Sequence, residues 1–187
     1  MMTTTHALFG ALVGATTATF APDLAPAAVV AGFASGALPD ADLLWTHRRS
    51  THFPVWGTVA AVAAVAAAAL VGTPAAVLVA VFAVAAAAHC LMDVFGGGVE
   101  LRPWEATSER GVYNHAGGYW VRPRRWVWYA GAPEDFLLAA GFALPALLAT
   151  GGRLRGGLLA VLAVSGLFVA VRRRLTGVTE RLLADGR

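Results

Sequence analysis

The chain has 187 residues, of which 58% are hydrophobic and only 13% are charged. Soluble domains usually carry about a quarter charged residues, so this composition favours an integral membrane protein and excludes a large additional soluble domain. The formal net charge is +3, and every basic residue is Arg. In a membrane protein an excess of basic residues reflects the topology and contact with lipid, so nucleic acid is not an expected partner.

Six apolar segments follow one another along the chain. They are residues 7–21, 26–38, 54–71, 74–92, 136–150 and 156–171. A helix needs about 20 residues to cross the hydrocarbon core, with about 17 as the lower edge, and only 54–71 and 74–92 meet that length comfortably. The first two segments, separated by Pro22 and Pro26, are either two thin spans or a re-entrant hairpin. We predict an all-α polytopic membrane bundle of five to six short spans, forming one integral membrane domain over residues 1–187.

The order of the segments predicts which residues share a membrane face. The start, MMTTTH, lacks the positive region of a secretory signal, so residues 7–21 are expected to be retained. Each of three pairs of segments leaves and returns, which brings all five histidines to the face where the chain begins. Of the 14 Arg, only Arg153 and Arg155 are expected on the other face. The remaining Arg, including Arg181 and Arg187, are expected on the same face as the histidines. Because positive loops stay cytoplasmic, the polar face and both termini are predicted to be cytoplasmic, in the cell membrane.

The one long hydrophilic stretch, residues 94–134, contains most of the Trp and Tyr residues together with several Arg. Trp and Tyr favour the lipid headgroup layer, where an apolar ring and a polar edge are both satisfied. We predict an aromatic and basic interfacial loop that lies along the membrane surface and contacts membrane lipid.

His89 and Asp93 stand four residues apart at the end of an Ala/Val helix, so their side chains share one helix face. Imidazole nitrogen and carboxylate oxygen are ordinary zinc or manganese ligands, and the single cysteine, Cys90, excludes a Cys-rich site. The alternative is a hydrated helix end where the two residues only bond to each other. Ionisable groups within a membrane segment are costly and usually functional, which favours the metal.

Two further groups of polar residues lie between the second and third apolar segments. Asp40 and Asp42 follow Pro39, where Asp residues are common turn formers but can also be ligands. His47 and His52 flank a short basic run directly after them, and either imidazole can ligate a metal.

The residues between these histidines suggest substrate contacts. Arg48 can hold an anionic oxygen, since its planar fork suits phosphate or carboxylate. Thr51 can cap the next helix or bond to a substrate oxygen. The alternative is a basic loop that contacts lipid headgroups. His6 follows three Thr that can cap the first helix, and taken alone it carries no signal.

The motif order resembles the YdjM-like family, whose members are described as LexA-regulated, membrane-bound, predicted metal-dependent hydrolases. The motifs are Thr5-His6, G-A-L-P-D-A-D at 36–42, H-R-x-x-T-H at 47–52, H-x-x-x-D at 89–93, Gly98 and Pro103. The resemblance covers roughly residues 3–105. The signature positions it implies are His6, Asp40, Asp42, His47, His52, His89 and Asp93, accompanied by Arg48 and Thr51. The chain also has a looser likeness to zinc-dependent phospholipase C and P1-type nuclease. It lacks the His that closely follows the H-x-x-x-D motif in those enzymes, so this likeness does not imply a three-zinc site.

We therefore expect a metal-dependent hydrolase that acts on a phosphate ester or lipid-like small molecule. One or two divalent ions, zinc or alternatively manganese, would be held by His6, Asp40, His52, His89 and Asp93. Asp42 or His47 would be general base or orienting residue, with Arg48 and Thr51 on the substrate. The alternatives are a divalent-cation transporter, which residues 54–71 and 136–150 disfavour by lacking any acid or His, and a non-catalytic structural protein. The oligomeric state is left open.

Overall fold

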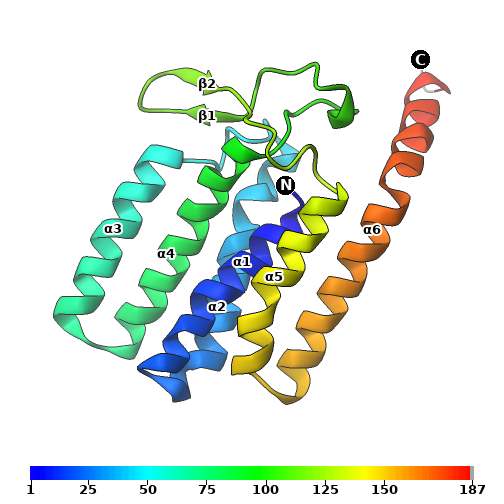
Figure 1. The fold of residues 1–187 in the computed structure, drawn as a ribbon. Coiled ribbons are helices and arrows are strands. Elements are labelled where there is room, and N and C mark those ends of the chain that lie inside the picture. The colour runs from blue at the N-terminus through cyan, green and yellow to red at the C-terminus, as the bar shows by residue number, and fades with distance from the viewer. Residues whose placement is uncertain (186–187) are drawn as a thin grey trace.

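The computed structural model describes the backbone of residues 1–185 and the side chains of residues 1–177. Arg187 and the side chain of Arg181 lie outside the described residues. Six α-helices account for most of the chain: α1 (Thr3–Ala15), α2 (Ala25–Ala37), α3 (Pro54–Val71), α4 (Pro74–Met92), α5 (Pro133–Ala149) and α6 (Gly152–Asp185). They run alternately up and down in chain order (Figure 1), which confirms the predicted all-α bundle.

Within the described residues, four segments are long and apolar enough to cross a membrane by length and composition. They are Pro22–Leu44, Pro54–Val71, Pro74–Phe95 and Gly152–Gly177. Helix α1, with 13 residues, and α5, with 17, are shorter. Figure 1 shows that α1 and α2 nevertheless extend between the same two ends of the bundle as their neighbours, so this pair does not turn back half-way. The number of helices that cross a membrane stays a prediction.

Helices α1 and α2 pack backbone to backbone through glycines four residues apart. A Cβ added to Gly10 would lie 1.9 Å from the carbonyl oxygen of Gly32, and one added to Gly32 would lie 2.0 Å from that of Gly10. A Cβ on Gly36 would lie 2.4 Å from the carbonyl oxygen of His6. Small residues at such positions let membrane helices approach closely, and here the approach brings His6 against the end of α2.

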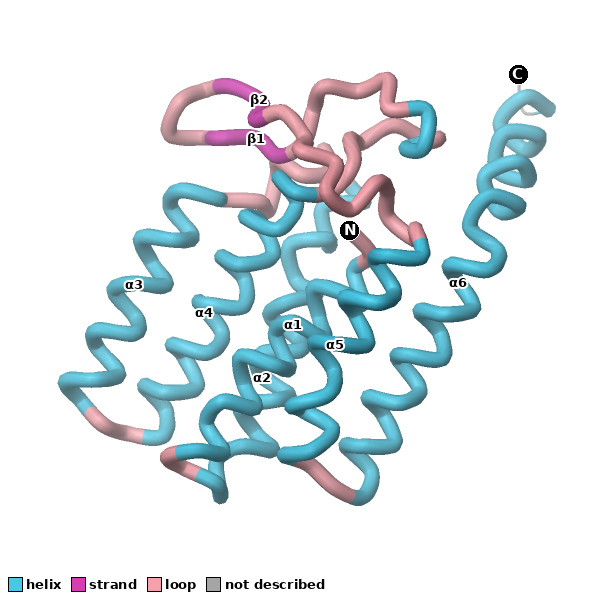
Figure 2. The backbone as a smooth tube through the Cα atoms, in the orientation of Figure 1, coloured by secondary structure: helices cyan, strands magenta, loops and turns pink. Residues whose placement is uncertain are grey.

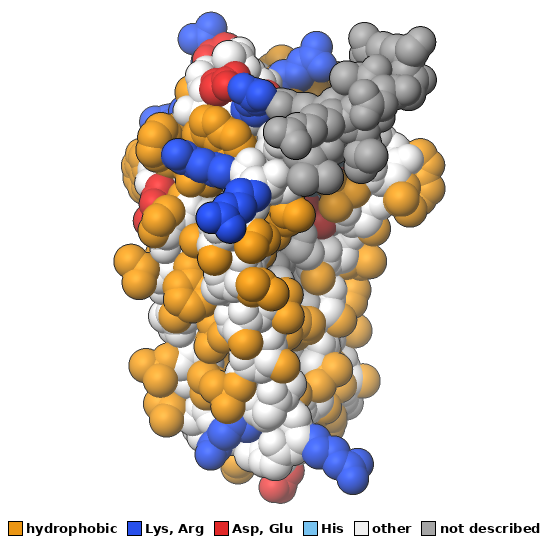
Figure 3. All heavy atoms as spheres, turned by 90° about the vertical axis from the view of Figure 1, so that its right-hand side faces the viewer, with side chains coloured by type: hydrophobic (Ala, Val, Ile, Leu, Met, Phe, Trp, Pro, Cys, Tyr) orange, Lys and Arg blue, Asp and Glu red, His pale blue; other side chains and the backbone are white. Residues whose placement is uncertain are grey.

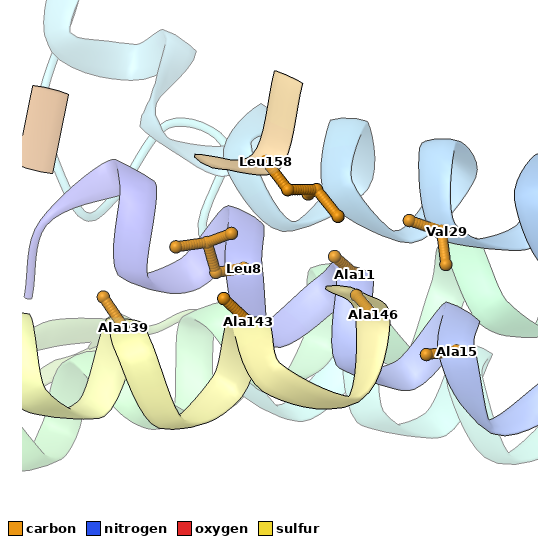
Figure 4. Packing of buried hydrophobic residues seen from close by; sticks show 8 residues of the cluster. All are labelled: Leu8, Ala11, Ala15, Val29, Ala139, Ala143, Ala146 and Leu158. Carbon is orange, nitrogen blue, oxygen red and sulfur yellow. The ribbon is translucent and has the colours of Figure 1, made fainter. Parts of the chain in front are cut away.

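The buried hydrophobic cluster is built mostly of small side chains from four helices, as Figure 4 shows. It comprises Leu8, Ala11, Ala15, Val29, Ala139, Ala143, Ala146 and Leu158. The start of α5 is fixed to the start of α1 by the buried Asp135, which accepts hydrogen bonds from the backbone N of Met2 at 2.8 Å and the hydroxyl of Thr5 at 2.7 Å. These contacts keep the N-terminal turn of α1 in place beside the polar end of the bundle.

Residues 94–134 fold over one end of the bundle (Figure 2). They include a short antiparallel hairpin of β1 (Val112–Asn114) and β2 (Tyr119–Val121), which the sequence analysis did not predict. The backbone N of Tyr113 donates to the carbonyl oxygen of Arg48 at 2.9 Å, which joins the hairpin to the turn before α3. Figure 3 shows basic side chains gathered at the two ends of the visible face, with apolar side chains between them.

Candidate metal centre

Four polar side chains converge at the end of the bundle beneath the hairpin. Asp40 lies in the 3-10 turn after α2 (η3, Leu38–Leu44), and His52 lies in the connection to α3. His89 occupies the last turn of α4, and Asp93 is the residue that ends this helix. One ligand atom from each lies within 4.8 Å of the other three, and all four residues are buried. We call these four residues the His/Asp cluster.

The distances within the His/Asp cluster match those between ligands of one metal ion. His52 Nε2 lies 3.1 Å from His89 Nε2, 3.2 Å from Asp93 Oδ2 and 3.8 Å from Asp40 Oδ1. His89 Nε2 lies 3.3 Å from Asp40 Oδ1 and 3.6 Å from Asp93 Oδ2. Ligands held about 2.0–2.2 Å from a tetrahedral zinc ion are about 3.3–3.6 Å apart. The cluster therefore has the spacing of a small divalent ion's coordination sphere.

Hydrogen bonds at the outer ring nitrogens direct both Nε2 lone pairs into the cluster. His89 Nδ1 donates to the carbonyl oxygen of Gly36 at 2.6 Å, and His52 Nδ1 donates to Asp42 Oδ2 at 2.9 Å. In the neutral form of each ring these bonds keep the proton on Nδ1, so that Nε2 would face the cluster as an acceptor. Such outer bonds are typical of metal-ligating histidines.

An acceptor-only centre is electrostatically unfavourable unless a cation lies within it. Asp93 Oδ2 is buried and has no hydrogen-bond partner in the described part of the chain. Arg48 Nε lies 3.3 Å from this oxygen and offsets one negative charge. Asp40 and the two imidazole lone pairs would still repel one another in a buried site without a further cation. The composition of the cluster therefore fits a divalent metal ion.

Asp42 lies directly behind the cluster and organises the turn that carries two histidines. It is fully buried, and it accepts from His47 Nδ1 at 2.9 Å as well as from His52. It also accepts from the backbone N of Arg49 at 3.2 Å and of Thr51 at 3.4 Å. Its carboxylate thus fixes the orientation of both rings.

His47 differs from the other histidines near the cluster in being accessible. Its side chain is 30% exposed, and its Nδ1 lies 3.9 Å from Asp40 Oδ1. A cavity of about 290 Å³ reaches the cluster at these two residues and continues between the start of α1 and helix α6. A small molecule in the cavity would be able to contact both His47 and Asp40.

His6, predicted as a metal ligand, lies against the cluster and is not one of its four members. Its Nε2 is 3.1 Å from Asp93 Oδ1, whereas His52 and His89 lie near the other oxygen, Oδ2. Its ring stacks on that of His89, with centroids 3.7 Å apart. The structure therefore places His6 where it supports Asp93 and His89 from the side of α1.

Arg48 and Thr51, predicted to contact substrate, are directed into the protein. The guanidinium of Arg48 is buried, donates from Nη1 to the carbonyl oxygen of Gly97 at 2.5 Å, and places Nε 3.3 Å from Asp93 Oδ2. Its backbone φ of 60° lies in a region that non-glycine residues rarely adopt, and such conformations cluster at functional sites. The hydroxyl of Thr51 donates to the carbonyl oxygen of Pro39 and so links the two polar turns.

Two contacts to the cluster were missed in the sequence analysis. The carbonyl oxygen of Gly36 orients His89, and the hydroxyl of Thr3 donates to Asp40 Oδ2 at 2.5 Å. A backbone carbonyl leaves no signature in residue type, although the glycine spacing on α2 was a signal of close helix approach. The fifth histidine, His115, instead packs its ring against Phe53 and Tyr113.

Comparison with known proteins identifies a family of membrane proteins. The family described as YdjM inner membrane protein matches residues 1–176. No curated protein and no solved structure gives a significant match. The family match extends the motif resemblance, which ended near residue 105, through α5 and most of α6.

Proposed function

We propose that this chain, which belongs to the YdjM inner membrane protein family, is a membrane-bound hydrolase that depends on a divalent metal ion. The observation that carries the proposal is the buried His/Asp cluster, whose four ligand atoms lie within 4.8 Å of one another. Two imidazoles and two carboxylates suit zinc, and the carboxylates also suit manganese. Such an ion would act as a Lewis acid when bound, and it would lower the pKa of a water that joined the four protein ligands to about 7.

His47 is our candidate general base. Its Nδ1–H donates a hydrogen bond to Asp42 Oδ1, which leaves Nε2 free to accept a proton from an attacking water. It is also the partly exposed histidine at the cavity. Asp42 acts through His47 and His52 as a positioning residue.

Arg48 and His6 support the same carboxylate from two sides. Arg48 offsets the charge of Asp93, and His6 contacts its second oxygen. Both are positioning residues in this proposal, and Thr51 holds the turn that precedes His52. None of the three needs to contact the substrate directly.

The expected substrate is a phosphate ester or lipid-like molecule presented at the membrane surface. We place the His/Asp cluster and the hairpin at the cytoplasmic face of a multi-pass protein, because Arg residues are concentrated in the segments at that end. Trp and Tyr of residues 94–134 support this position at the headgroup layer.

The proposal is tested by turnover in detergent micelles. The purified full chain, loaded with zinc or manganese, is assayed on a panel of phosphate esters beside His47→Gln and His115→Gln variants. We expect His47→Gln to lower kcat by about 10²–10⁴-fold without loss of metal, whereas His115→Gln leaves kcat unchanged. No turnover by the metal-loaded chain, or equal effects of the two variants, would refute the proposal. Metal uptake into liposomes without turnover would favour a transporter.

A further inference from the structure

The cavity at the cluster has a polar edge and an apolar wall. Asp40 and His47 form the polar edge, while Leu43, Val164 and Phe168 contribute apolar surface. Its volume of about 290 Å³ lies just below the range for small-molecule sites, about 300–1,000 Å³. Such a shape suits a slender amphipathic ligand rather than a compact polar one.

The wall formed by α6 belongs to surface that suits a lipid environment. Val164 is 59% exposed and lies in Gly152–Gly177, one of the four segments long and apolar enough to cross a membrane. The hydroxyl of Ser165 donates to that of Thr4 at 2.8 Å and so closes part of the gap between α6 and α1. The cavity therefore lies beside a helix face that is apolar enough for contact with hydrocarbon.

The turn that carries Asp40 also exposes large apolar side chains. Leu43 is 65%, Leu44 82% and Trp45 70% exposed, directly after Asp40 and Asp42. Three such residues in a row are costly in water but favourable at a lipid interface, where Trp is enriched. Because Leu43 also lines the cavity, this exposure supports a position of the cavity near the boundary between headgroups and acyl chains.

Positive charge lies one helical turn beyond the apolar wall. The guanidinium of Arg172 is 5.8 Å from the ring centroid of Phe168 and 5.6 Å from that of Trp104, and Arg173 is 5.4 Å from the Trp104 ring. Gly131, with φ of +88°, packs against both Phe168 and Arg172, since a Cβ there would meet both side chains. Arginine at this position favours an anionic headgroup.

We propose that this cavity admits an acyl chain of an anionic membrane lipid sideways from the bilayer, between α1 and α6. The headgroup ester would then lie at Asp40 and His47, and Val164 and Phe168 would determine which chains fit. This inference rests on the proposed hydrolase and names its substrate class as a lipid phosphate ester.

The test is photo-crosslinking in vesicles. The full chain is reconstituted in phosphatidylcholine containing a small fraction of phosphatidic acid with a photoactivatable group in one acyl chain, and adducts are mapped by mass spectrometry. A matched arm uses phosphatidylcholine with the same labelled chain. Val164→Trp fills the cavity, and Leu167→Trp adds the same ring at a 65% exposed position outside the lining. Thermal unfolding midpoints establish that both variants fold.

We expect the phosphatidic acid probe to label residues 1–4, 40–47 or 164–168. Val164→Trp should reduce this labelling about tenfold, the loss expected when contact with roughly two methylene groups is removed. Leu167→Trp should leave it unchanged. Equal labelling by both lipids, or equal effects of the two variants, would show only bulk lipid contact and overturn the inference.

The outcomes separate this inference from the hydrolase itself. Specific labelling without turnover of any ester would retain the lipid site and refute the hydrolase. Turnover of a water-soluble phosphate ester with labelling unaffected by Val164→Trp would retain the hydrolase and refute the lipid site.

Discussion

The Nε2 atoms of His52 and His89 lie 3.1 Å apart, although the Nδ1 of each ring already donates to an acceptor. Two neutral imidazoles in this arrangement present lone pairs to each other, beside the carboxylates of Asp40 and Asp93. A divalent cation at the centre of the cluster would resolve this electrostatic conflict.

Asp42→Asn should weaken metal binding without removing a ligand. The carboxylate holds the Nδ1 atoms of His47 and His52, and loss of such an outer partner typically costs about 10–100-fold in metal affinity. Competition with a chromophoric chelator measures the change. Asp23→Asn, at an exposed acid in the turn before α2, is the control and should keep the original affinity. Identical affinities in the two variants would contradict an orienting role for Asp42.

Arg48→Met should destabilise the fold far more than Arg49→Met. Arg48 is buried beside Asp93 and satisfies backbone carbonyls, and removal of one partner from a buried ion pair costs about 3–5 kcal/mol. Arg49 is exposed and lies 4.4 Å over the ring of Tyr113, a contact worth about 0.5–1 kcal/mol. The thermal unfolding midpoints of the two variants are compared in detergent. Similar shifts of the midpoint in both variants would show that Arg48 is not the buried partner of Asp93.

The sequence was sufficient to predict the helices and their order. The bounds 54–71 and 74–92 agree with α3 and α4, because a Pro begins each helix and a Gly or Asp ends it. Helix α1 begins earlier than the apolar pattern, since Thr3 to His6 are helical but polar. Helix α6 continues well beyond residue 171, because its Arg- and Leu-rich end keeps good helix formers after hydropathy falls.

The candidate site could be predicted only in part. Helical spacing paired His89 with Asp93, and counting segments brought Asp40 and His52 to the same end. The separation of His6 from the four cluster members depends on how α1 packs, which residue types do not encode. The hairpin was missed because its strands have three residues each, too few for a clear alternating pattern.

Gly10→Ala should disturb the cluster from a distance. Its Cβ would collide with the carbonyl oxygen of Gly32, and overpacking of this kind costs about 1–3 kcal/mol. Separation of α1 from α2 would also move Gly36 away from His89 and lower the metal content. Gly141→Ala in α5, where no described atom lies within 4 Å of the added Cβ, should leave metal content unchanged and raise stability by up to about 1 kcal/mol. Equal metal content and stability in the two variants would count against close α1–α2 packing as a determinant of the site.

The central claim is most directly tested by metal analysis of the purified full chain after growth in metal-replete medium. Elemental mass spectrometry compares the original protein, a His89→Ala/Asp93→Ala variant and a His115→Ala variant, which removes a histidine outside the His/Asp cluster. We expect about one equivalent of zinc or manganese in the original protein and in His115→Ala, and almost none in the double variant, because two of four ligands are lost. Equal metal content in all three proteins, including almost none in each, would contradict a metal centre at His52, His89, Asp40 and Asp93.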